Sequence, residues 1–396
     1  MAQARILVVG GGIAGLTAAL ALARHGFSVS VLERAAQFRE VGAGLQLGAN
    51  AMRVMAALGL APDVASRGFR PDAAEIRLGD LGHQVFCLRF AQNAALRTAY
   101  VQIHRADLLD LLVAAVRDAG VALHPAVRIV KIVENTDSVA GVTEDGQRFE
   151  ADILIGADGL RSAVQGYVLA PQPPRFTGQV AWRATVAADA VPAGLVAPRG
   201  TIWVGPGRHL VTYFLRGGQL INIVAVEERD DWREEGWMLP GDPALLRAAF
   251  ADWHPRVTTL LSKVSETYLW ALYDRAPLPV WTKGRVALIG DACHPMLPFL
   301  AQGAAMAIED GWVLADCLAR DTGTAGLARY ASLRQGRTAR VQGAARRNAG
   351  RFHRRGPVGR TLEFGPMALA NLFAPWVLRR SMRWLYDHDV TGGSGV

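Results

Sequence analysis

The chain has 396 residues, 51% of them hydrophobic and 20% charged, a composition that excludes a mainly disordered protein and supports a large buried core. At ~150 residues per domain, this length corresponds to two or three domains or to one interleaved unit. The net charge of +8 comes from residues 334–360, which hold nine arginines and no acidic residue, and a basic region this local argues against a general nucleic-acid-binding surface.

The number and spacing of the cysteines and the hydropathy of the chain exclude further classes of protein. The three cysteines, Cys87, Cys293 and Cys317, do not have the spacing of a disulfide framework, a redox pair or a zinc site, so no metal is expected. No run of about 18 apolar residues predicts an integral membrane segment. The chain enters a strand directly after Arg5, without a signal-peptide pattern, and this favours a cytoplasmic protein.

The N-terminal region predicts a βαβ unit with a dinucleotide-binding turn. Apolar strands at Ile6–Val9 and Ser28–Leu32 flank an Ala/Leu-rich helix at Ile13–His25. The turn, Gly10 to Gly15, has the pattern Gly-x-Gly-x-x-Gly, which lets the backbone approach a pyrophosphate at the positive end of the helix. Glu33 ends the second strand, where a carboxylate holds a ribose hydroxyl. The alternative is a purely structural glycine turn.

The next segments alternate helices and short strands. Helices are predicted at Met52–Leu58 and Ala106–Ala119. They are followed by antiparallel strands around a turn at Asp145-Gly146. The strand Ile153–Ile155 then ends at Gly156-Ala157-Asp158-Gly159, a turn with little specificity by itself.

The sequence pattern changes after Pro171 to Pro174, which are predicted to form a linker. Short strands separated by glycine turns predict an antiparallel sheet outside the βαβ unit, with the helix Pro243–Trp253 as its partner. These strands are Gln179–Ala187, Thr201–Val204, His209–Leu215 and Leu220–Val226.

Nucleotide-binding features return near residue 285. The strand Arg285–Ile289 delivers Gly290 and Asp291 to a loop that runs to Pro298, and a helix begins at Gln302. Two glycine signals at opposite ends of the chain indicate a long dinucleotide, FAD rather than NAD. Asp291 would bind ribityl or ribose hydroxyls, and the amides of Gly303 to Ala305 would face the flavin edge that becomes negative on reduction.

These features predict a mixed α/β fold. A discontinuous Rossmann-type FAD-binding domain would cover 1–171 and 276–330. An antiparallel-sheet substrate domain, 172–275, is inserted in it, and a helical region, 331–396, follows. In that last region, arginines at helical spacing form either a solvated helix face or a surface that steers anionic ligands. Phe364–Leu378 is predicted to be a packing helix pair; the alternative is a peripheral membrane contact.

The three motifs, in this order, resemble those of the class A flavoprotein aromatic hydroxylases, which are single-component FAD monooxygenases. The resemblance spans essentially the whole chain and extends to members that hydroxylate 6-hydroxynicotinate, 3-hydroxybenzoate and salicylate. It includes the stretches Val41–Asn50, Ile103–Leu108 and Ala301–Asp310.

This resemblance implies the p-hydroxybenzoate hydroxylase fold, bound FAD, and NADH or NADPH as co-substrate. It also implies O2 as oxidant, a flavin C4a-hydroperoxide, and hydroxylation of a small aromatic or heteroaromatic phenol or hydroxy acid. The protein would be a monomer or homodimer without nucleic-acid partners. Two other functions stay open: a reductase or dehydrogenase of the same fold acting on a larger unsaturated ligand, and a non-catalytic flavin-binding protein.

The cofactor-binding residues come from the motifs together with the resemblance. They are Gly10, Gly12, Ile13, Ala14, Gly15, Glu33, Arg34, Gly44, Gln46, Gln102, Arg105, Asp158, Gly159, Gly290, Asp291, Pro298, Gly303, Ala304 and Ala305.

The catalytic candidates are His209, Tyr213 and Pro298. A phenol attacks far better as the phenolate, so a base or proton relay near the ring is required. His209 and Tyr213 are four residues apart on one predicted strand, which places them on one face about 13 Å apart, and related hydroxylases have His and Tyr at the matching positions. The alternative is that Tyr213 packs in the sheet and His209 lies in the turn. Pro298 would offer its carbonyl near the substrate hydroxyl.

Several residues depart from the family pattern or invite a different role. Gln165 stands where the family usually has arginine, and Gln46 where the hydroxynicotinate enzyme has histidine. His294 is assigned to support of the cofactor loop rather than to catalysis. Trp182 is expected in the core, and Arg183 is expected to brace the domain interface.

Overall fold

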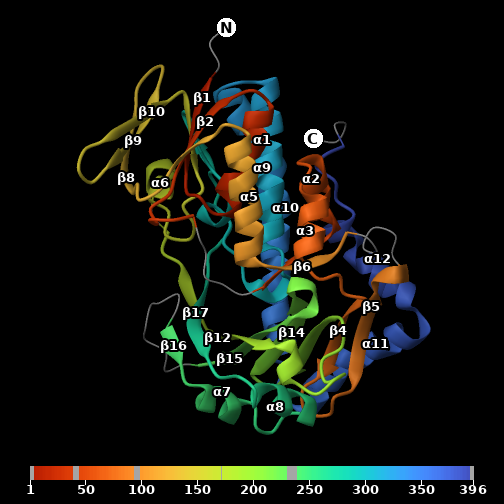
Figure 1. The fold of residues 1–396 in the computed structure, drawn as a ribbon. Coiled ribbons are helices and arrows are strands. Elements are labelled where there is room, and N and C mark those ends of the chain that lie inside the picture. The colour runs from red at the N-terminus through yellow and green to blue at the C-terminus, as the bar shows by residue number, and fades with distance from the viewer. Residues whose placement is uncertain (1–3, 39–43, 93–98, 171, 230–238, 393–396) are drawn as a thin grey trace.

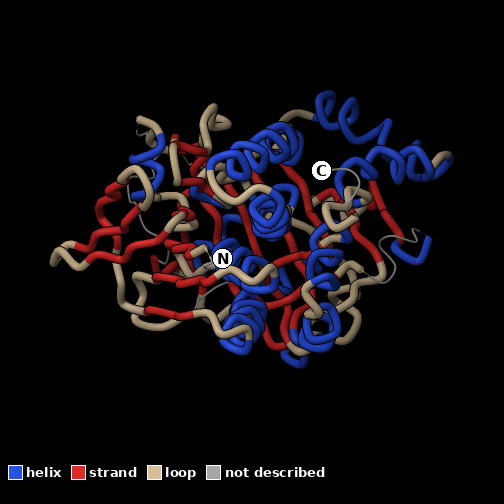
Figure 2. The backbone as a smooth tube through the Cα atoms, turned by 90° about the horizontal axis from the view of Figure 1, so that it is seen from above, coloured by secondary structure: helices blue, strands red, loops and turns tan. Residues whose placement is uncertain are grey.

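The computed structural model describes residues 4–38, 44–92, 99–170, 172–229 and 239–392. Val41 to Ala43 of the family-like stretch and Pro171 of the predicted linker lie outside these ranges. A helix-covered parallel sheet forms one half of the molecule, and a large, mostly antiparallel sheet forms the other (Figure 1). From above, strands run through the middle and helices lie along both sides (Figure 2).

The first half is built on a six-stranded sheet in the order β18-β19-β11-β1-β2-β7. All neighbouring strands are parallel except the β18–β19 pair. Side chains of β1 are buried on both faces, which explains its continuous apolar run. In chain order the strands are β1 (Arg5–Val9), β2 (Ser28–Leu32), β7 (Ala122–His124), β11 (Ile153–Gly156), β18 (Thr282–Lys283) and β19 (Val286–Leu288).

Long helices cover this sheet, and two of them approach unusually closely. A Cβ added to Gly311 of α9 would lie 2.7 Å from the backbone nitrogen of Ala18 in α1, so only glycine permits this crossing. The helices of this half are α1 (Ile13–Arg24), α2 (Ala49–Ala57), α3 (Ala61–Arg67), α5 (Arg105–Asp118), α6 (Ala163–Val168), α9 (Gly303–Arg320) and α10 (Thr324–Phe352). The predicted helices therefore occur within a few residues of their expected bounds.

Two small sheets complete this half. One is the antiparallel set predicted around Asp145-Gly146, which comprises β8 (Ile129–Glu134), β9 (Val139–Thr143) and β10 (Arg148–Ala151). The other pairs β3 (Gly44–Leu47) with β6 (Val101–His104) and sets Gln46 opposite Gln102.

The second half is an eight-stranded sheet in the order β16-β17-β12-β15-β14-β13-β4-β5. Two of its strands, β4 and β5, come from the N-terminal part of the chain, so the sheet is not confined to the segment 172–275. Its strands are β4 (Ala73–Leu78), β5 (Gln84–Arg89), β12 (Arg175–Ala187), β13 (Gly200–Gly205), β14 (Arg208–Leu215), β15 (Leu220–Glu228), β16 (Leu239–Gly241) and β17 (Thr267–Asp274).

The two faces of this sheet have different environments. The outer face forms its own apolar cluster with α7 (Pro243–Ala249) and α8 (Pro255–Leu261). Trp182 is buried in that cluster, as expected, and its indole N–H donates to Glu227 at 2.9 Å. The inner face, which carries His209, faces the first half of the molecule. Successive side chains along β12 and β14 point alternately to the outer and the inner face, so the apolar cluster and the cavity-facing residues alternate along each strand.

The C-terminal segment forms α11 (Pro357–Phe373) and α12 (Pro375–Tyr386). The predicted helix pair is present, but it leaves much apolar surface uncovered: Leu372 is 72% and Phe373 75% exposed. On the other side, α11 packs along β5 (Figure 1). Within the described ranges, no helix combines the length and apolarity that crossing a bilayer requires.

A buried ion cluster joins α9 to α10. Arg334 is 1% exposed and donates to Glu309 at 2.7 Å and to Asp310 at 2.8 Å. Arg337 forms a bidentate pair with Glu309, at 2.7 Å for both contacts. The basic segment is therefore not a uniformly solvated helix face, because its first two arginines are structural.

We predict that Arg334→Met lowers the free energy of unfolding by about 3–5 kcal/mol, because it leaves buried carboxylates without their counter-ion. Urea unfolding followed by circular dichroism measures this loss. Arg320→Met is the matched control, since it removes a more exposed arginine that pairs with Asp316 at 3.0 Å on the same helix, and it should cost less than about 1 kcal/mol. Equal losses in the two variants would contradict a supporting role for the buried cluster.

Candidate active site

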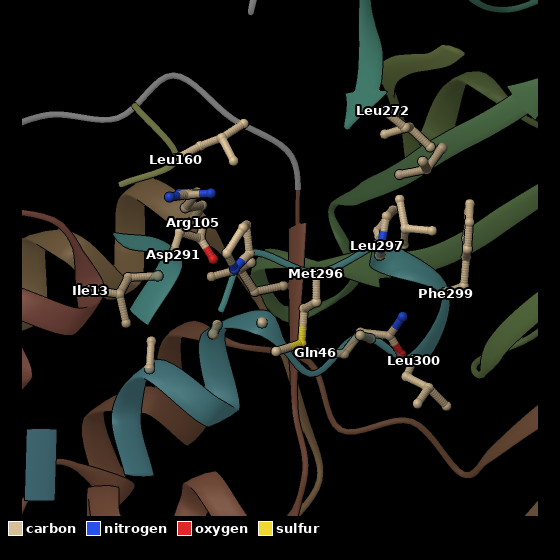
Figure 3. Close-up of a pocket in the computed structure, with 18 of the residues that line it drawn as sticks. Ile13, Gln46, Arg105, Leu160, Leu272, Asp291, Met296, Leu297, Phe299 and Leu300 are labelled. Atoms are coloured by element: carbon tan, nitrogen blue, oxygen red, sulfur yellow. The ribbon is translucent and has the colours of Figure 1, made fainter. Parts of the chain in front are cut away.

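One cavity of about 1600 Å³ runs from the N-terminus of α1 to the inner face of the eight-stranded sheet. Pockets for a single small ligand occupy roughly 300–1000 Å³, so this volume has room for a dinucleotide and a small molecule together. Figure 3 shows its central part, with Arg105 on the left, Met296 and Gln46 in the middle, and Leu272, Leu297 and Leu300 on the right.

The glycine turn forms the nucleotide end of the cavity. Gly10, Gly12, Ile13 and Ala14 line it. A Cβ on Gly10, whose φ is +113°, would lie 2.3 Å from the carbonyl oxygen of Ala157. Helix α1 has no side-chain cap and no acidic residue in its first turn, so its amides are open to an anion. Gly15 does not line the cavity; a Cβ there would meet the Gly10 carbonyl oxygen at 1.9 Å.

Glu33 lies beside this turn. Its carboxylate accepts hydrogen bonds from the amides of Gly11, at 2.7 Å, and Ala35, at 2.8 Å. Both Glu33 and Arg34 line the cavity. Glu33 therefore stands beside the glycine turn at the end of the second strand, and its role as a ribose-binding acid stays a prediction.

Asp158 and Gly159 line the cavity as well, but the Asp158 side chain forms hydrogen bonds to residues that follow it closely in the chain. It accepts hydrogen bonds from the amides of Ala163, at 2.7 Å, and Val164, at 3.2 Å, and from the Ser162 hydroxyl. Burial raises the pKa of this carboxyl despite those bonds. The Asp158 carboxylate therefore helps to cap the N-terminus of α6.

Gln165, the residue that departs from the family pattern, is a buried residue of α6 itself. Its side-chain amide donates to the carbonyl of Ala292 at 3.3 Å. The glutamine thus supports the loop that carries Asp291.

Arg105 and Asp291 lie next to each other on one side of the cavity (Figure 3). Burial lowers the pKa of Arg105, and the charge of Asp291 opposes that shift. Gly290 does not line the cavity. Its φ is +60° and a Cβ would lie 2.7 Å from the Ala14 Cβ, so glycine lets the loop approach α1.

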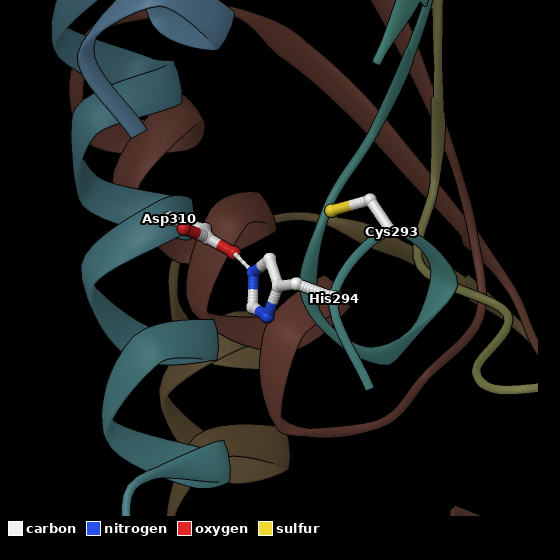
Figure 4. A group of neighbouring side chains, drawn as sticks. All are labelled: Cys293, His294 and Asp310. Carbon is white, nitrogen blue, oxygen red and sulfur yellow. Dashed lines mark hydrogen bonds and ion pairs between the residues drawn. The ribbon is translucent and has the colours of Figure 1, made fainter. Parts of the chain in front are cut away.

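His294 has a structural position. It is 1% exposed and its Nε2 bonds Asp310 (Figure 4). Asp310 also accepts the amide of Gly290 at 3.1 Å. Burial disfavours the ionised carboxyl, but His294 and Arg334 outweigh burial and lower the pKa of Asp310. The histidine therefore holds the cofactor loop through Asp310 and not through Asp291.

Cys293, His294 and Asp310 lie close enough together to suggest a metal site (Figure 4). The chemistry disfavours one. Burial raises the pKa of the Cys293 thiol well above its usual value, and the Arg334 guanidinium already occupies Asp310 at 2.8 Å. A cation here would have to displace a buried cation.

The sheet wall brings His209 and Tyr213 together on β14, and both line the cavity. His209 is 1% exposed. Its ring packs against Phe299 and Phe352, with centroids 4.9 and 5.3 Å away. Its Nδ1 lies 2.7 Å from Nε2 of His353. Burial, with a smaller contribution from His353, holds the pKa of His209 well below its usual range, so the ring is neutral at neutral pH.

Tyr213 contacts the opposite wall. Its hydroxyl donates to the Gly44 carbonyl at 2.6 Å, while the Gly44 amide donates to Asn222 at 2.9 Å. Burial raises the pKa of the Tyr213 phenol. A Cβ on Gly44 would lie 2.4 Å from the tyrosine ring, which explains the glycine. Tyr213 thus joins β3 to the sheet, and its oxygen keeps free acceptor capacity.

Pro298 begins a short helical turn, η5 (Pro298–Leu300), and lines the cavity. Side chains of α10 hold the loop around it: Asn348 donates to the Phe299 carbonyl at 3.0 Å and Gln342 to the Pro295 carbonyl at 2.8 Å. Gly303 and Ala304 also line the cavity, and α9, which they begin, has no side-chain cap.

Four cofactor candidates do not reach the cavity wall: Gly15, Gln102, Gly290 and Ala305. Gln102 is fully buried, and neither of its side-chain amide atoms has a hydrogen-bond partner among the described residues. Gln46, opposite it, lines the cavity and accepts a bond from Tyr100 at 2.9 Å.

Arg183 was not among the predicted site residues, yet it lines the cavity. Its guanidinium lies over the Trp270 ring, 3.0 Å from the centroid. Within the described part of the chain it pairs with no carboxylate, and its buried Nε has no hydrogen-bond partner. Burial lowers the pKa of Arg183 to about 9, so the group is still charged at neutral pH.

Comparison with known proteins identifies relatives over most of the chain. The profile of the family described as "FAD binding domain" matches residues 3–213 and 221–348. A 3-amino-4-hydroxybenzoate 2-monooxygenase from Streptomyces platensis is 38% identical over 358 residues, 88% of each protein. A 6-hydroxynicotinate 3-monooxygenase from Pseudomonas fluorescens is 36% identical over 79% of this chain and 82% of its own. A salicylate hydroxylase substrate complex superposes with a TM-score of 0.83 at 28% identity, covering 98% of this chain and 96% of the other.

We predict that Gly10→Ala weakens FAD binding at least about tenfold, a change of about 1.4 kcal/mol, because the new Cβ would collide with the Ala157 backbone. Titration of the apoprotein with FAD, followed by flavin fluorescence, measures the Kd. Gly146→Ala is the matched control, since Gly146 also has a positive φ but nothing lies within 4 Å of its Cβ position. A Gly10→Ala protein that binds FAD as tightly as the control would contradict the proposed phosphate turn.

A second prediction concerns pH. The fold holds the pKa of His209 below its usual value, so below pH ~6.5 the unfolded chain binds a proton that the folded chain does not. This histidine should therefore reduce the free energy of unfolding by up to about 1.4 kcal/mol per pH unit as the pH falls below ~6.5. His209→Gln should flatten that dependence in urea titrations between pH 7.5 and 5. Identical slopes in both proteins would show that His209 is not held neutral.

Proposed function

The chain belongs to the FAD binding domain family, and from this premise we propose that it hydroxylates a small aromatic acid that carries a ring hydroxyl. The resemblance to flavoprotein aromatic hydroxylases is confirmed by this match and by the similar monooxygenases described above. The protein is an FAD-dependent monooxygenase with NAD(P)H as co-substrate. The identity of the ring acid and the roles of individual residues are the proposal.

The cavity residues fit FAD. The glycine turn and the uncapped N-terminus of α1 would take the pyrophosphate, and Glu33 a ribose. Arg105 and Asp291 would meet the middle of the cofactor, and the open N-terminus of α9 would face the flavin ring. Bound FAD supplies the redox chemistry, accepting a hydride from NAD(P)H and activating O2.

The observation that carries the substrate class is Arg183. A charged guanidinium within a cavity wall, without a carboxylate partner among the described residues, favours an anionic ligand. Trp270 holds it in place through a cation–π contact. A substrate carboxylate could pair with the Arg183 guanidinium through charge-assisted hydrogen bonds. Because two such bonds can form side by side, they would also fix the orientation of the carboxylate. Arg183 therefore becomes a candidate for substrate binding, beyond the interface brace expected from the sequence.

The phenol end of the substrate is assigned to His209. Arg183 on β12 and His209 on β14 are separated by one intervening strand, which puts their strands about 10 Å apart. A single aromatic ring with a carboxylate at one end and a hydroxyl at the other can bridge the two side chains. Neutral His209 would accept the phenolic proton, and the Tyr213 oxygen could accept a hydrogen bond from the same substrate.

Names of the relatives support this class. Each of 3-amino-4-hydroxybenzoate, 6-hydroxynicotinate and salicylate combines a ring hydroxyl with a carboxylate. Apolar walls around the site, including Leu272, Leu297 and Phe299, would exclude water from the reacting ring.

The reaction class is tested with purified holoenzyme, NADH or NADPH, and a panel of hydroxybenzoates and hydroxypyridine carboxylates under ¹⁸O2. We expect at least one acid to accelerate NAD(P)H oxidation and to yield one ¹⁸O-labelled product per nucleotide oxidised. Oxidation that no acid stimulates, or that never labels the ring, would contradict the proposal.

We predict that Arg183→Gln raises the Kd of 3-amino-4-hydroxybenzoate about 100-fold, since hydrogen bonds between charged groups contribute up to about 3 kcal/mol. Titration of the oxidised enzyme, followed by the flavin absorbance, gives the Kd. The same ring without its carboxylate, 2-aminophenol, is the control ligand, and its Kd should change less than about threefold. If the binding of both ligands weakened equally, Arg183 would not be the residue that binds the substrate carboxylate.

A further inference from the structure

A chain of polar side chains leads from the cavity to the protein surface. His209 lies at the cavity wall, and its Nδ1 is 2.7 Å from Nε2 of His353, the residue that ends α10. His353 is 3% exposed. On its far side, Nδ1 of His353 lies 3.1 Å from Oε1 of Glu228, whose side chain is 35% exposed. His209, His353 and Glu228 thus form a continuous hydrogen-bonded path from the cavity wall to solvent.

The hydrogen-bond partners at His353 satisfy both of its neutral tautomers. Nδ1 meets the Glu228 carboxylate at 3.1 Å and the side-chain amide of Gln179 at 3.2 Å. When Nδ1 carries a proton it can donate to Glu228, and when it does not it can accept from Gln179. A buried histidine with both an acceptor and a donor at one nitrogen can gain and lose a proton there, because that nitrogen keeps one hydrogen bond in either state.

The environment of the path keeps both rings neutral between transfers. Burial lowers the pKa of both His209 and His353, although the Glu228 hydrogen bond opposes the shift at His353. The charged and titratable groups on the path are His209, His353, Glu228 and Arg355, which pairs with Glu228. The other neighbours, Phe299, Phe352 and Gln179, do not titrate. A proton placed on either imidazole is therefore passed on rather than retained.

We propose that His353 and Glu228 form a proton relay that carries the substrate's phenolic proton from His209 to bulk water. This inference rests on the proposed function, because it requires a phenol at His209. His353 and Glu228 touch no reacting atom; they act through His209.

The transfer conserves protons and involves no redox change. The phenol O–H bond breaks and its proton joins Nε2 of His209, leaving the phenolate. The Nδ1 proton of His209 moves to Nε2 of His353, and the Nδ1 proton of His353 moves to Glu228. Glu228 releases a proton to water. The reverse set of transfers then returns one proton from water to the product phenolate, and this restores the starting tautomer of each ring before the next turnover.

Proton release on substrate binding tests the relay without turnover. Oxidised holoenzyme is mixed with 3-amino-4-hydroxybenzoate in unbuffered solution that contains a pH-indicator dye, at a pH where the free ligand is a phenol. The wild type should release about one proton per ligand bound. His353→Gln and Glu228→Gln should slow this release, His353→Gln by roughly 10²-fold, while the Kd of the ligand changes little.

Two further measurements separate a relay from a structural role. Added imidazole should accelerate proton release in His353→Ala and leave the wild type unchanged. Asp252→Asn is the matched control: it removes an exposed carboxylate that pairs at 2.7 Å with Arg208, the neighbour of His209 on β14. It should release protons at the wild-type rate.

The outcomes distinguish failure of the relay from failure of the function. Hydroxylation by the wild type with unslowed proton release in His353→Gln would overturn the relay and leave the function standing. Slow release without any rescue by imidazole would assign His353 a structural role and also overturn the relay. If the wild type hydroxylates no ring acid, the proposed function is wrong, and the relay falls with it.

Discussion

The buried ion cluster at Asp310 is the interaction on which the rest of the site depends. Asp310 accepts the Gly290 amide, bonds His294 and pairs with Arg334, so one carboxylate fixes the cofactor loop, its histidine and helix α10. Glu309, the next residue, pairs with Arg334 and Arg337 and accepts a bond from Asn50 on α2 at 2.7 Å. These charges are shielded from water and have full partners, so removing any member leaves a costly unpaired charge. Such a cluster favours one arrangement of the loop over alternatives.

Helix α10 contacts both the loop that Asp310 holds and the residues on the far side of the cavity. Its first half carries Arg334 and Arg337, which hold the loop at the flavin side. Its middle carries Gln342 and Asn348, which hold the backbone around Pro298, and its end places Phe352 and His353 against β14. One helix therefore positions both the loop proposed to bind the cofactor and the histidine proposed as the base. In the proposed mechanism, this single helix would set the position of the substrate relative to the flavin.

The strands, the glycine turn and the loop at one end of the cavity could be predicted from the sequence, because their signals are local. The glycine turn, Glu33 and the loop at Gly290 all lie next to strands whose apolar runs are easy to recognise. The period of a strand also correctly placed His209 and Tyr213 on one face. His353 could not be found in this way: 144 residues separate it from His209, and only the packing of α10 on the sheet joins them. Arg183 stood in a recognised strand, but its lack of an acidic partner among the described residues is a property of the folded cavity. Strands β4 and β5 joined the large sheet by long-range pairing that their short sequence runs do not predict.

In the proposed substrate complex, Arg183 and His209 hold the two ends of a hydroxylated aromatic acid beneath the flavin. The decisive experiment is a crystal structure of the enzyme with FAD and 3-amino-4-hydroxybenzoate. We expect the ligand carboxylate within hydrogen-bond distance, about 3 Å, of the Arg183 guanidinium and the ring hydroxyl at a similar distance from Nε2 of His209. A ligand bound with its carboxylate away from Arg183, or with its hydroxyl away from His209, would contradict the proposed complex.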